Sequence, residues 1–192
     1  AKNSASWREQ KQLMRAGNYI VPEGGGDVRG ALGMASFWQA VSAQSGSHFN
    51  SVIAAAGTGA TLAGLMAASL PGQTVHGVAV LRGSANMYQR YCKHVLAMAH
   101  ALRRGFRTEL REPIGWQLHT DFHAGGDGPA RGEFASEIHR LACKVGVPLD
   151  PVYTGKMLRA LVLLSKQRAF APKSKVLVLH TGGLQGLSLI HI

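Results

Sequence analysis

The chain has 192 residues, of which 46% are hydrophobic and 16% charged, a composition that suits one well-packed domain or one domain and part of another. No apolar run reaches the roughly eighteen residues of a membrane span, and the start "AKNSASWREQ" lacks a secretory signal, so we expect a cytoplasmic protein with no membrane partner. The formal net charge of +11 favours anionic partners, either nucleic acid or a phosphorylated ligand.

Nucleic acid is the less favoured of these two partner classes. The basic residues are dispersed along the chain, with the densest group at 101–112. No aromatic residues alternate with them, as an RNA-binding sheet would require. We therefore expect no nucleic-acid partner.

Hydrophobic periodicity alternates along the chain between short β-branched runs and longer segments of helical spacing. In chain order, the sequence predicts a helix at 6–17, a strand at 19–22, a helix at 34–44 after a glycine-rich run, a strand at 51–56, a helix at 62–70, a strand at 75–81, a helix around 86–102, a weaker strand near 116–119, helices at 133–146 and 154–167, and a strand at 175–180. This alternation predicts an α/β fold with an open, mostly parallel sheet and helices on both faces.

The stretch "GTGAT" at 57–61 joins a buried strand to a helix through small residues. Small residues let backbone N–H groups close on an anion, the helix N-terminus adds partial positive charge, and Thr58 and Thr61 offer hydroxyl donors. The pattern lacks the Lys-Ser or Lys-Thr pair of an ATP-binding loop. An ordinary turn with Thr61 as the N-cap explains the same residues equally well.

A second buried strand, in "VLVLHTGG" at 176–183, also ends in small and hydroxyl residues. Ligands collect at the carboxyl ends of parallel strands, so two such endings indicate one crevice. Thr181 would offer a neutral hydroxyl there. The alternative is a simple turn at Gly182 and Gly183, with His180 as a satisfied core residue.

Four segments occur in an order that resembles the 1-aminocyclopropane-1-carboxylate deaminase and D-cysteine desulfhydrase family. They are "YIVPEGGGDVRGALG", "AAAGTGATLAGL", "VPLDPVYTGKMLRAL" and "VLVLHTGG". Members of this family are pyridoxal-phosphate enzymes with the tryptophan synthase β-like fold. The resemblance covers about 19–183, and "FHAGGDG" at 122–128 is similar to a further family loop.

The resemblance implies pyridoxal 5′-phosphate as the cofactor, a small amino acid as the substrate and a homodimeric intact protein. The matched loop that holds the cofactor phosphate comprises Gly57, Thr58, Gly59, Ala60 and Thr61. Tyr153 matches a tyrosine near the cofactor ring that relays a proton. Thr181, followed by Gly182, matches a threonine near the pyridine nitrogen.

Two positions favour the desulfhydrase branch, which eliminates a thiol or similar group to give a keto acid and ammonia. Where the deaminases resemble "VYEGK" and "HLGG", this chain has Thr154 and Thr181. The cyclopropane deaminase remains an alternative, as does a non-catalytic module that binds a phosphate ligand.

The family's Schiff-base lysine belongs to a "GGNK"-like segment upstream of the part matching Tyr19. We therefore expect a fragment that lacks this lysine and is inactive alone. Residues 1–18 would be a remnant of a small domain, 19–186 the phosphate-binding large domain, and 187–192, "LSLIHI", a non-native tail resembling a translated sequencing adapter.

Three other polar positions have local explanations. Asp150 is expected to cap the turn that enters the 154–167 helix. Lys156 is expected to be exposed in the first turn of that helix. His119 and His123 have the spacing of a metal-binding pair, but no third ligand is evident, and we expect no metal site.

Overall fold

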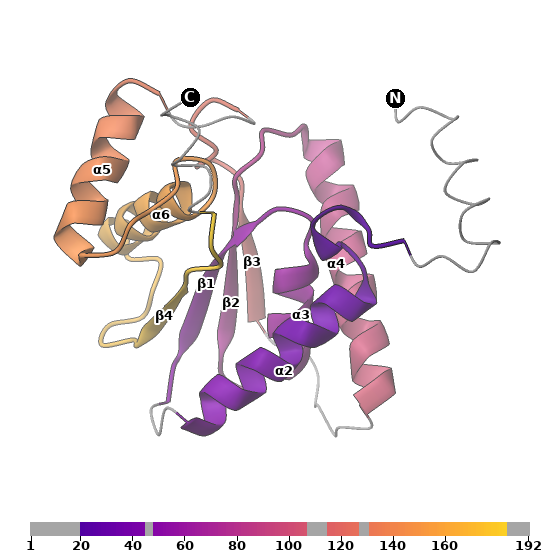
Figure 1. The fold of residues 1–192 in the computed structure, drawn as a ribbon. Coiled ribbons are helices and arrows are strands. Elements are labelled where there is room, and N and C mark those ends of the chain that lie inside the picture. Colours follow the sequence, from indigo (N-terminus) through magenta and orange to yellow (C-terminus); the bar gives the residue numbers. More distant parts are fainter. Residues whose placement is uncertain (1–19, 45–47, 107–114, 127–130, 184–192) are drawn as a thin grey trace, which may run out of the picture.

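The computed structural model describes residues 20–44, 48–106, 115–126 and 131–183 (Figure 1). Four parallel strands form one sheet in the order β3-β2-β1-β4. The strands are β1 (Ser51–Ala56), β2 (Thr74–Ala79), β3 (Gly115–His119) and β4 (Val176–Leu179). The helices are the 3₁₀ turn η1 (Glu23–Gly25), α2 (Val28–Gln44), α3 (Ala60–Ala68), α4 (Ala85–Phe106), α5 (Glu133–Val145) and α6 (Thr154–Lys166).

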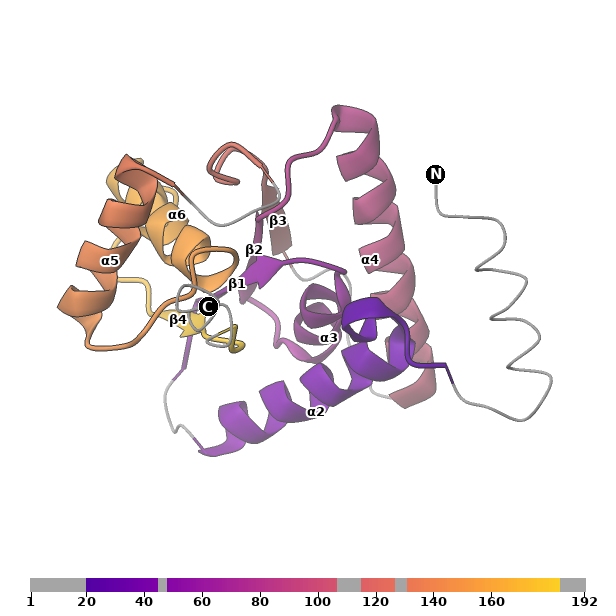
Figure 2. The same ribbon diagram turned by 45° about the horizontal axis from the view of Figure 1, so that its top comes forward.

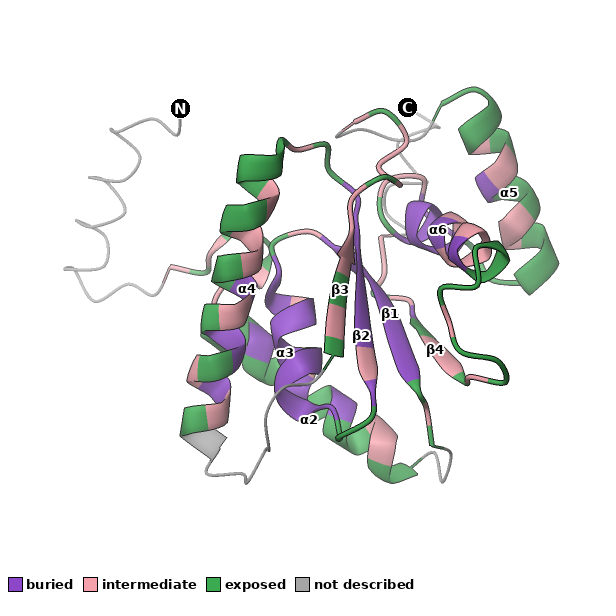
Figure 3. Ribbon diagram, turned by 180° about the vertical axis from the view of Figure 1, so that it is seen from behind, coloured by how far each residue is buried: buried purple, intermediate pink, exposed green. Residues whose placement is uncertain are grey.

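Helices cover both faces of the sheet, which confirms the predicted α/β fold (Figures 1 and 3). Side chains alternate along β1, so Val52 and Ala54 belong to the core under α2, α3 and α4, while Ile53 and Ala55 pack against α6. Every residue of β1 is buried. An apolar run without polar alternation is therefore the sequence signature of a strand with both faces covered.

The structure corrects the prediction at its N-terminal end. The helix predicted at 6–17 lies outside the described residues, and the strand predicted at 19–22 is wrong, because 20–22 have no strand pairing and lead into η1. Helix α2 begins at Val28, six residues before the predicted start at Met34. The Asp27 carboxylate accepts hydrogen bonds from the Arg29 and Gly30 N–H groups and so caps α2. The glycines in the first turns of α2 are poor helix formers, which is why its true start was not predicted.

No helix in the described ranges combines the length and apolar character needed to cross a bilayer.

A histidine pair on two neighbouring strands faces the segment after α6, with His76 buried and His119 partly buried. His76 on β2 and His119 on β3 stack with their ring centroids 5.4 Å apart, and their Nδ1 and Nε2 atoms lie 3.1 Å apart. Phe170 packs edge-on against His76. Burial, and then the neighbouring His119, lower the pKa of His76 from 6.5 to about 4, and burial lowers the pKa of His119 as well.

This pair should make stability depend on pH. The folded protein holds both rings neutral, whereas the unfolded chain protonates them near pH 6.5, so their stabilising contribution is complete above pH 6.5 and is lost as pH falls towards 4. We expect a loss of about 2 kcal/mol over this window, measured by urea unfolding. A double variant, His76→Leu with His119→Leu, should show a shallower pH dependence; equal slopes in the two proteins would contradict this assignment.

Candidate functional site

The loop from β1 to α3 packs closely against α4 at Gly59. Gly59, the N-cap of α3, has φ +97°, which favours glycine, and a Cβ there would lie 2.7 Å from Val95 Cγ2. The helix begins at Ala60, so the alternative of Thr61 as the N-cap is wrong. The first N–H groups of α3 and its positive dipole end therefore face the carboxyl end of β1.

Tyr153 is the N-cap residue of α6 and is positioned by a buried carboxylate. Asp150 accepts hydrogen bonds from the N–H groups of Val152, Tyr153 and Thr154 at 2.9, 2.6 and 2.8 Å. The Thr154 hydroxyl also donates to Asp150, at 2.5 Å. Asp150 therefore caps the turn as predicted and fixes the backbone from which the half-exposed Tyr153 ring projects.

The "HTGG" segment continues from β4, whose pairing with β1 brings Leu179 opposite Ala54. His180 is satisfied at both ring nitrogens: Nδ1 accepts from the Gly182 N–H, and Nε2 lies 2.9 Å from the Pro148 carbonyl oxygen. A Cβ on Gly183 would lie 2.7 Å from Asp150 Oδ2, so this backbone packs directly against the carboxylate that positions Tyr153.

These three segments meet in one pocket of about 190 Å³ at the carboxyl ends of the strands, the end turned forward in Figure 2. Its lining contains Gly57, Thr58, Gly59, Thr61, Tyr153 and Thr181, with further contributions from Gly24, Ala55, Ala56 and Leu62. Segments about 95 and 120 residues apart in the chain thus share a single cavity because parallel strands end together.

Some expected residues lie outside this lining. The side chain of Ala60 is buried in α3, and Gly182 follows the lining residue Thr181 without joining it. Thr154, one of the two positions that favoured the desulfhydrase branch, is fully buried and bonded to Asp150. Of those two positions, Thr181 alone lines the pocket.

Gly24 was missed by the sequence analysis, although the run "EGGGD" was visible. Its carbonyl accepts a long hydrogen bond of 3.4 Å from the Thr58 hydroxyl, and a Cβ on Gly24 would lie 2.8 Å from Thr58 Cγ2. Gly24 therefore packs over Thr58 and forms part of the pocket wall. The Thr58 hydroxyl already has an acceptor, which reduces its role as an anion donor.

The pocket suits the phosphate end of a cofactor. None of the described residues that line it has a charged side chain, so its attraction for an anion comes from backbone N–H groups and the N-terminus of α3. At Gly57, a Cβ would point at the Tyr153 ring, 3.6 Å from Cε1, and would narrow the space between the loop and the ring. The residues present therefore fit a phosphate on the loop with a flat ring beside Tyr153.

A buried polar group without a partner in the described part of the chain borders the same loop. Tyr91 on α4 packs against Gly59, and its buried hydroxyl has no hydrogen-bond partner within the described ranges. Burial raises the pKa of this phenol, so it stays protonated and remains a donor.

Lys156 is not the exposed lysine that we expected. Only 1% of its surface is accessible, and its ammonium donates to the carbonyl oxygens of Val80 and Gly126, at 3.1 and 2.9 Å. The first turn of α6 is covered by the end of β2 and the loop at 122–126, a tertiary contact that local sequence does not reveal. Lys156 does not line the pocket formed by the loop at 57–61, Tyr153 and Thr181.

The two histidines singled out by their spacing do not share a ligand site. His119 contacts His76, whereas His123 Nδ1 accepts from the Gly125 N–H. Among the residues with described positions, no group of three His, Cys, Asp or Glu side chains is arranged to hold a metal ion.

Comparison with known proteins defines the class of protein. The sequence pattern of the family described as "Pyridoxal-phosphate dependent enzyme" matches residues 3–182. The chain therefore belongs to this family, whose cofactor is pyridoxal phosphate.

More particular relatives agree with the resemblance seen in the sequence. A protein of Pyrococcus horikoshii that carries the provisional name 1-aminocyclopropane-1-carboxylate deaminase is 33% identical over 181 residues, which is 92% of this chain and 53% of that protein. A D-cysteine desulfhydrase of Yersinia pestis is 33% identical over 178 residues, 90% of this chain and 52% of the relative.

A crystal structure of an ACC deaminase homologue has the same fold. It superposes with a TM-score of 0.75 at 30% identity, covering 97% of this chain and 57% of the other. The chain thus spans about half the length of the relatives that it matches.

Proposed function

We propose that the intact protein catalyses a pyridoxal-phosphate-dependent elimination and deamination of a small amino acid, of the D-cysteine desulfhydrase type. The observation that carries this proposal is the single pocket shared by the loop at 57–61, Tyr153 and Thr181. The neutral Thr181 hydroxyl favours the desulfhydrase reaction over the deaminase reaction, because relatives with the cyclopropane activity resemble "HLGG" at this position.

Each part of the pocket has a role in this proposal. Backbone N–H groups from Gly57 to Thr61, including that of Ala60, bind the phosphate. Thr181, held by the turn at Gly182, offers its hydroxyl to the ring nitrogen without forcing that nitrogen to be protonated. Tyr153 covers one side of the ring, excludes water there, and holds or releases a proton at its phenol oxygen.

When bound, pyridoxal phosphate withdraws electrons from the α-carbon of an attached amino acid and so permits loss of the α-proton and of the β-substituent. For cysteine the balance is one amino acid and one water giving a three-carbon keto acid, ammonium and hydrogen sulfide. The sulfur leaves with the electron pair of the carbon–sulfur bond. The lysine that carries the cofactor in this family would come from the segment that this chain does not match.

The same proposal covers the organisation of the intact protein. Residues 19–186 would form its phosphate-binding large domain, with 1–18 belonging to the connection with a small domain. We further propose a cytoplasmic homodimer that binds no nucleic acid. The chain alone would be inactive.

The cyclopropane deaminase is the second candidate, because the Pyrococcus horikoshii relative and the solved homologue are both named for it. Turnover of the cyclopropane substrate, without release of sulfide from D-cysteine, by the full-length protein would favour it over our proposal. The non-catalytic alternative would be favoured if the protein bound the cofactor but turned over neither D-cysteine nor the cyclopropane substrate.

A substitution of Gly57 by alanine tests the cofactor pocket. The added methyl group would make only an ordinary contact with Tyr153, at 3.6 Å, so the fold should persist while the space between loop and ring narrows. We expect saturable pyridoxal phosphate binding by the unaltered chain, and binding about tenfold weaker in Gly57→Ala, measured by cofactor fluorescence.

The matched control is Gly33→Ala, an identical change at an α2 position with no atom within 4 Å of the added Cβ. It should bind the cofactor like the unaltered chain. Absence of saturable binding by the unaltered chain, or equal affinities in all three proteins, would count against the proposed pocket.

A further inference from the structure

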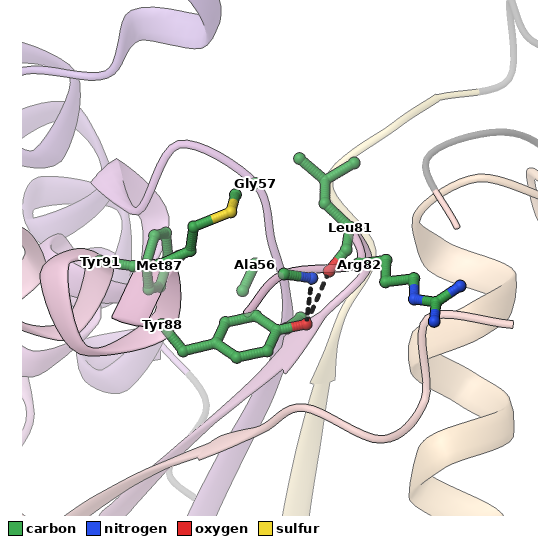
Figure 4. A pocket seen from close by; sticks show the side chains of 9 residues that line it. Ala56, Gly57, Leu81, Arg82, Met87, Tyr88 and Tyr91 are labelled. Atoms are coloured by element: carbon green, nitrogen blue, oxygen red, sulfur yellow. Dashed lines mark hydrogen bonds between the residues drawn. The ribbon is translucent and has the colours of Figure 1, made fainter. Parts of the chain in front are cut away.

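A second pocket, of about 170 Å³, adjoins the cofactor pocket (Figure 4). Ala56 and Gly57 belong to both linings, so the end of β1 is a common wall. The rest of the second lining comes from the end of β2 and from α4, including Leu81, Met87 and Tyr88. We call this cavity the side-chain pocket.

The walls of the side-chain pocket are mostly apolar, although Arg82 and Tyr91 also line it, and one wall is fixed by hydrogen bonds. The Tyr88 hydroxyl accepts a hydrogen bond from the Gly83 N–H at 2.9 Å and donates to the Leu81 carbonyl oxygen at 3.0 Å, so its polar atom is occupied and its ring forms the wall. Figure 4 shows both bonds, with the Arg82 side chain extending away from Tyr88. Ala56 and Ala79 line the same cavity at the strand ends.

Two large apolar side chains of this pocket are accessible to solvent: Met87 is 55% exposed and Leu81 39% exposed. Exposing such side chains around a concave site is typical of ligand-binding surfaces. The volume is sufficient for a substantial group, because an apolar protein cavity of about 150 Å³ accommodates benzene. An unsubstituted cysteine thiol would leave most of this space empty.

We infer that the side-chain pocket receives an apolar group carried by the substrate, an inference that rests on the function proposed above. A ligand with its phosphate on the loop at 57–61 reaches this cavity directly past Gly57, since that residue borders both spaces. The matching substrate class is an amino acid whose β-sulfur carries an alkyl or aryl group of up to about six carbons. The α-proton is lost and the carbon–sulfur bond at the β-carbon breaks; the sulfur keeps its electron pair, takes up a proton and leaves as the apolar thiol. One water then converts the remaining three carbons to the keto acid and ammonium.

The inference can be tested by binding, without any turnover. Reduced conjugates of the cofactor with an amino acid, N-(5′-phosphopyridoxyl)-D-alanine and N-(5′-phosphopyridoxyl)-S-propyl-D-cysteine, need no lysine to bind. Titrating each into the 192-residue chain by calorimetry should give about tenfold tighter binding of the S-propyl conjugate, since each buried methylene strengthens binding and the pocket mouth is open.

The variant Leu81→Asp should remove this preference, because it places a charge in the apolar wall, while binding of the alanine conjugate stays within about twofold. Leu70→Asp is the matched control, the same change at a leucine that is 49% exposed and lines neither pocket. Met87→Ala, a smaller change, gives a second variant in case Leu81→Asp does not fold, and should reduce the preference.

The two proposals fail in different ways. Equal affinity for the two conjugates, or a preference that survives in both Leu81→Asp and Met87→Ala, would overturn the side-chain pocket and leave the cofactor pocket standing. Failure of both conjugates to bind the unaltered chain would overturn the cofactor pocket, and the side-chain pocket with it.

Discussion

Replacing Gly64 by alanine is expected to destabilise the fold by about 3 kcal/mol. Gly64 lies where α3 crosses α2, and a Cβ there would overlap the Ala31 carbonyl oxygen and approach Met34 Cβ and the Ala35 nitrogen to 2.7 and 2.9 Å. Two of these three atoms belong to the backbone of α2, so the overlap can be removed only if α2 moves as a whole. Because α3 begins at the proposed phosphate loop, the same displacement should weaken pyridoxal phosphate binding.

Gly33→Ala is again the control for this substitution. It makes the same chemical change on α2 in open space, and it should stabilise the protein by about 0.5–1 kcal/mol, because alanine favours a helix more than glycine does. Free energies of unfolding from urea titrations would separate the two variants. Similar values for Gly64→Ala and Gly33→Ala would show that the helices do not cross as closely as described.

Replacing Asp150 by alanine should cost about 3–4 kcal/mol of stability. The carboxylate is 1% exposed and accepts from three backbone N–H groups and the Thr154 hydroxyl, and alanine would leave these donors buried without their acceptor. It also contacts the position where a Gly183 Cβ would lie. Loss of Asp150 should therefore disturb Tyr153 and the "HTGG" segment together and weaken cofactor binding.

Asp27→Ala is the matched control for Asp150→Ala. Asp27 also caps a helix, but it accepts from only two N–H groups and is half-buried, so its loss should cost about 1 kcal/mol and leave cofactor affinity unchanged. Chemical denaturation and cofactor titration of both variants provide the comparison. An Asp150→Ala protein no less stable than Asp27→Ala would contradict the proposed role of the buried carboxylate.

The sheet and its helices could be predicted from the sequence because their signals are local. The run "SVIAAA" is apolar throughout and coincides with β1, since a strand covered on both faces needs no polar alternation. The start of α2 could not be predicted, because its glycines argue against a helix and only Asp27 indicates a cap. Packing against α3, made close by Gly64, outweighs the poor propensity of the glycine-rich segment.

The candidate site also has parts that could be predicted from the sequence and parts that could not. Thr58 and Thr181 could be assigned to one crevice because each follows a recognisable strand and parallel strands end together, whereas Tyr153 was assigned to it only by the family resemblance. The side-chain pocket could not be found, since Leu81 and Met87 resemble ordinary core residues in the sequence. Nor could the burial of Lys156, which depends on carbonyl groups 76 and 30 residues away.

The central claim is that the backbone after β1 holds a phosphate beside Tyr153 and Thr181. Its most direct test is a titration of the ¹⁵N-labelled chain with pyridoxal phosphate, and separately with inorganic phosphate, followed by amide chemical shifts. We expect both ligands to shift the amides from Thr58 to Thr61, and pyridoxal phosphate alone to shift Tyr153 and Thr181. Saturable shifts confined to other parts of the chain would contradict the claim, as would pyridoxal phosphate binding that leaves the amides of Thr58 to Thr61 unmoved.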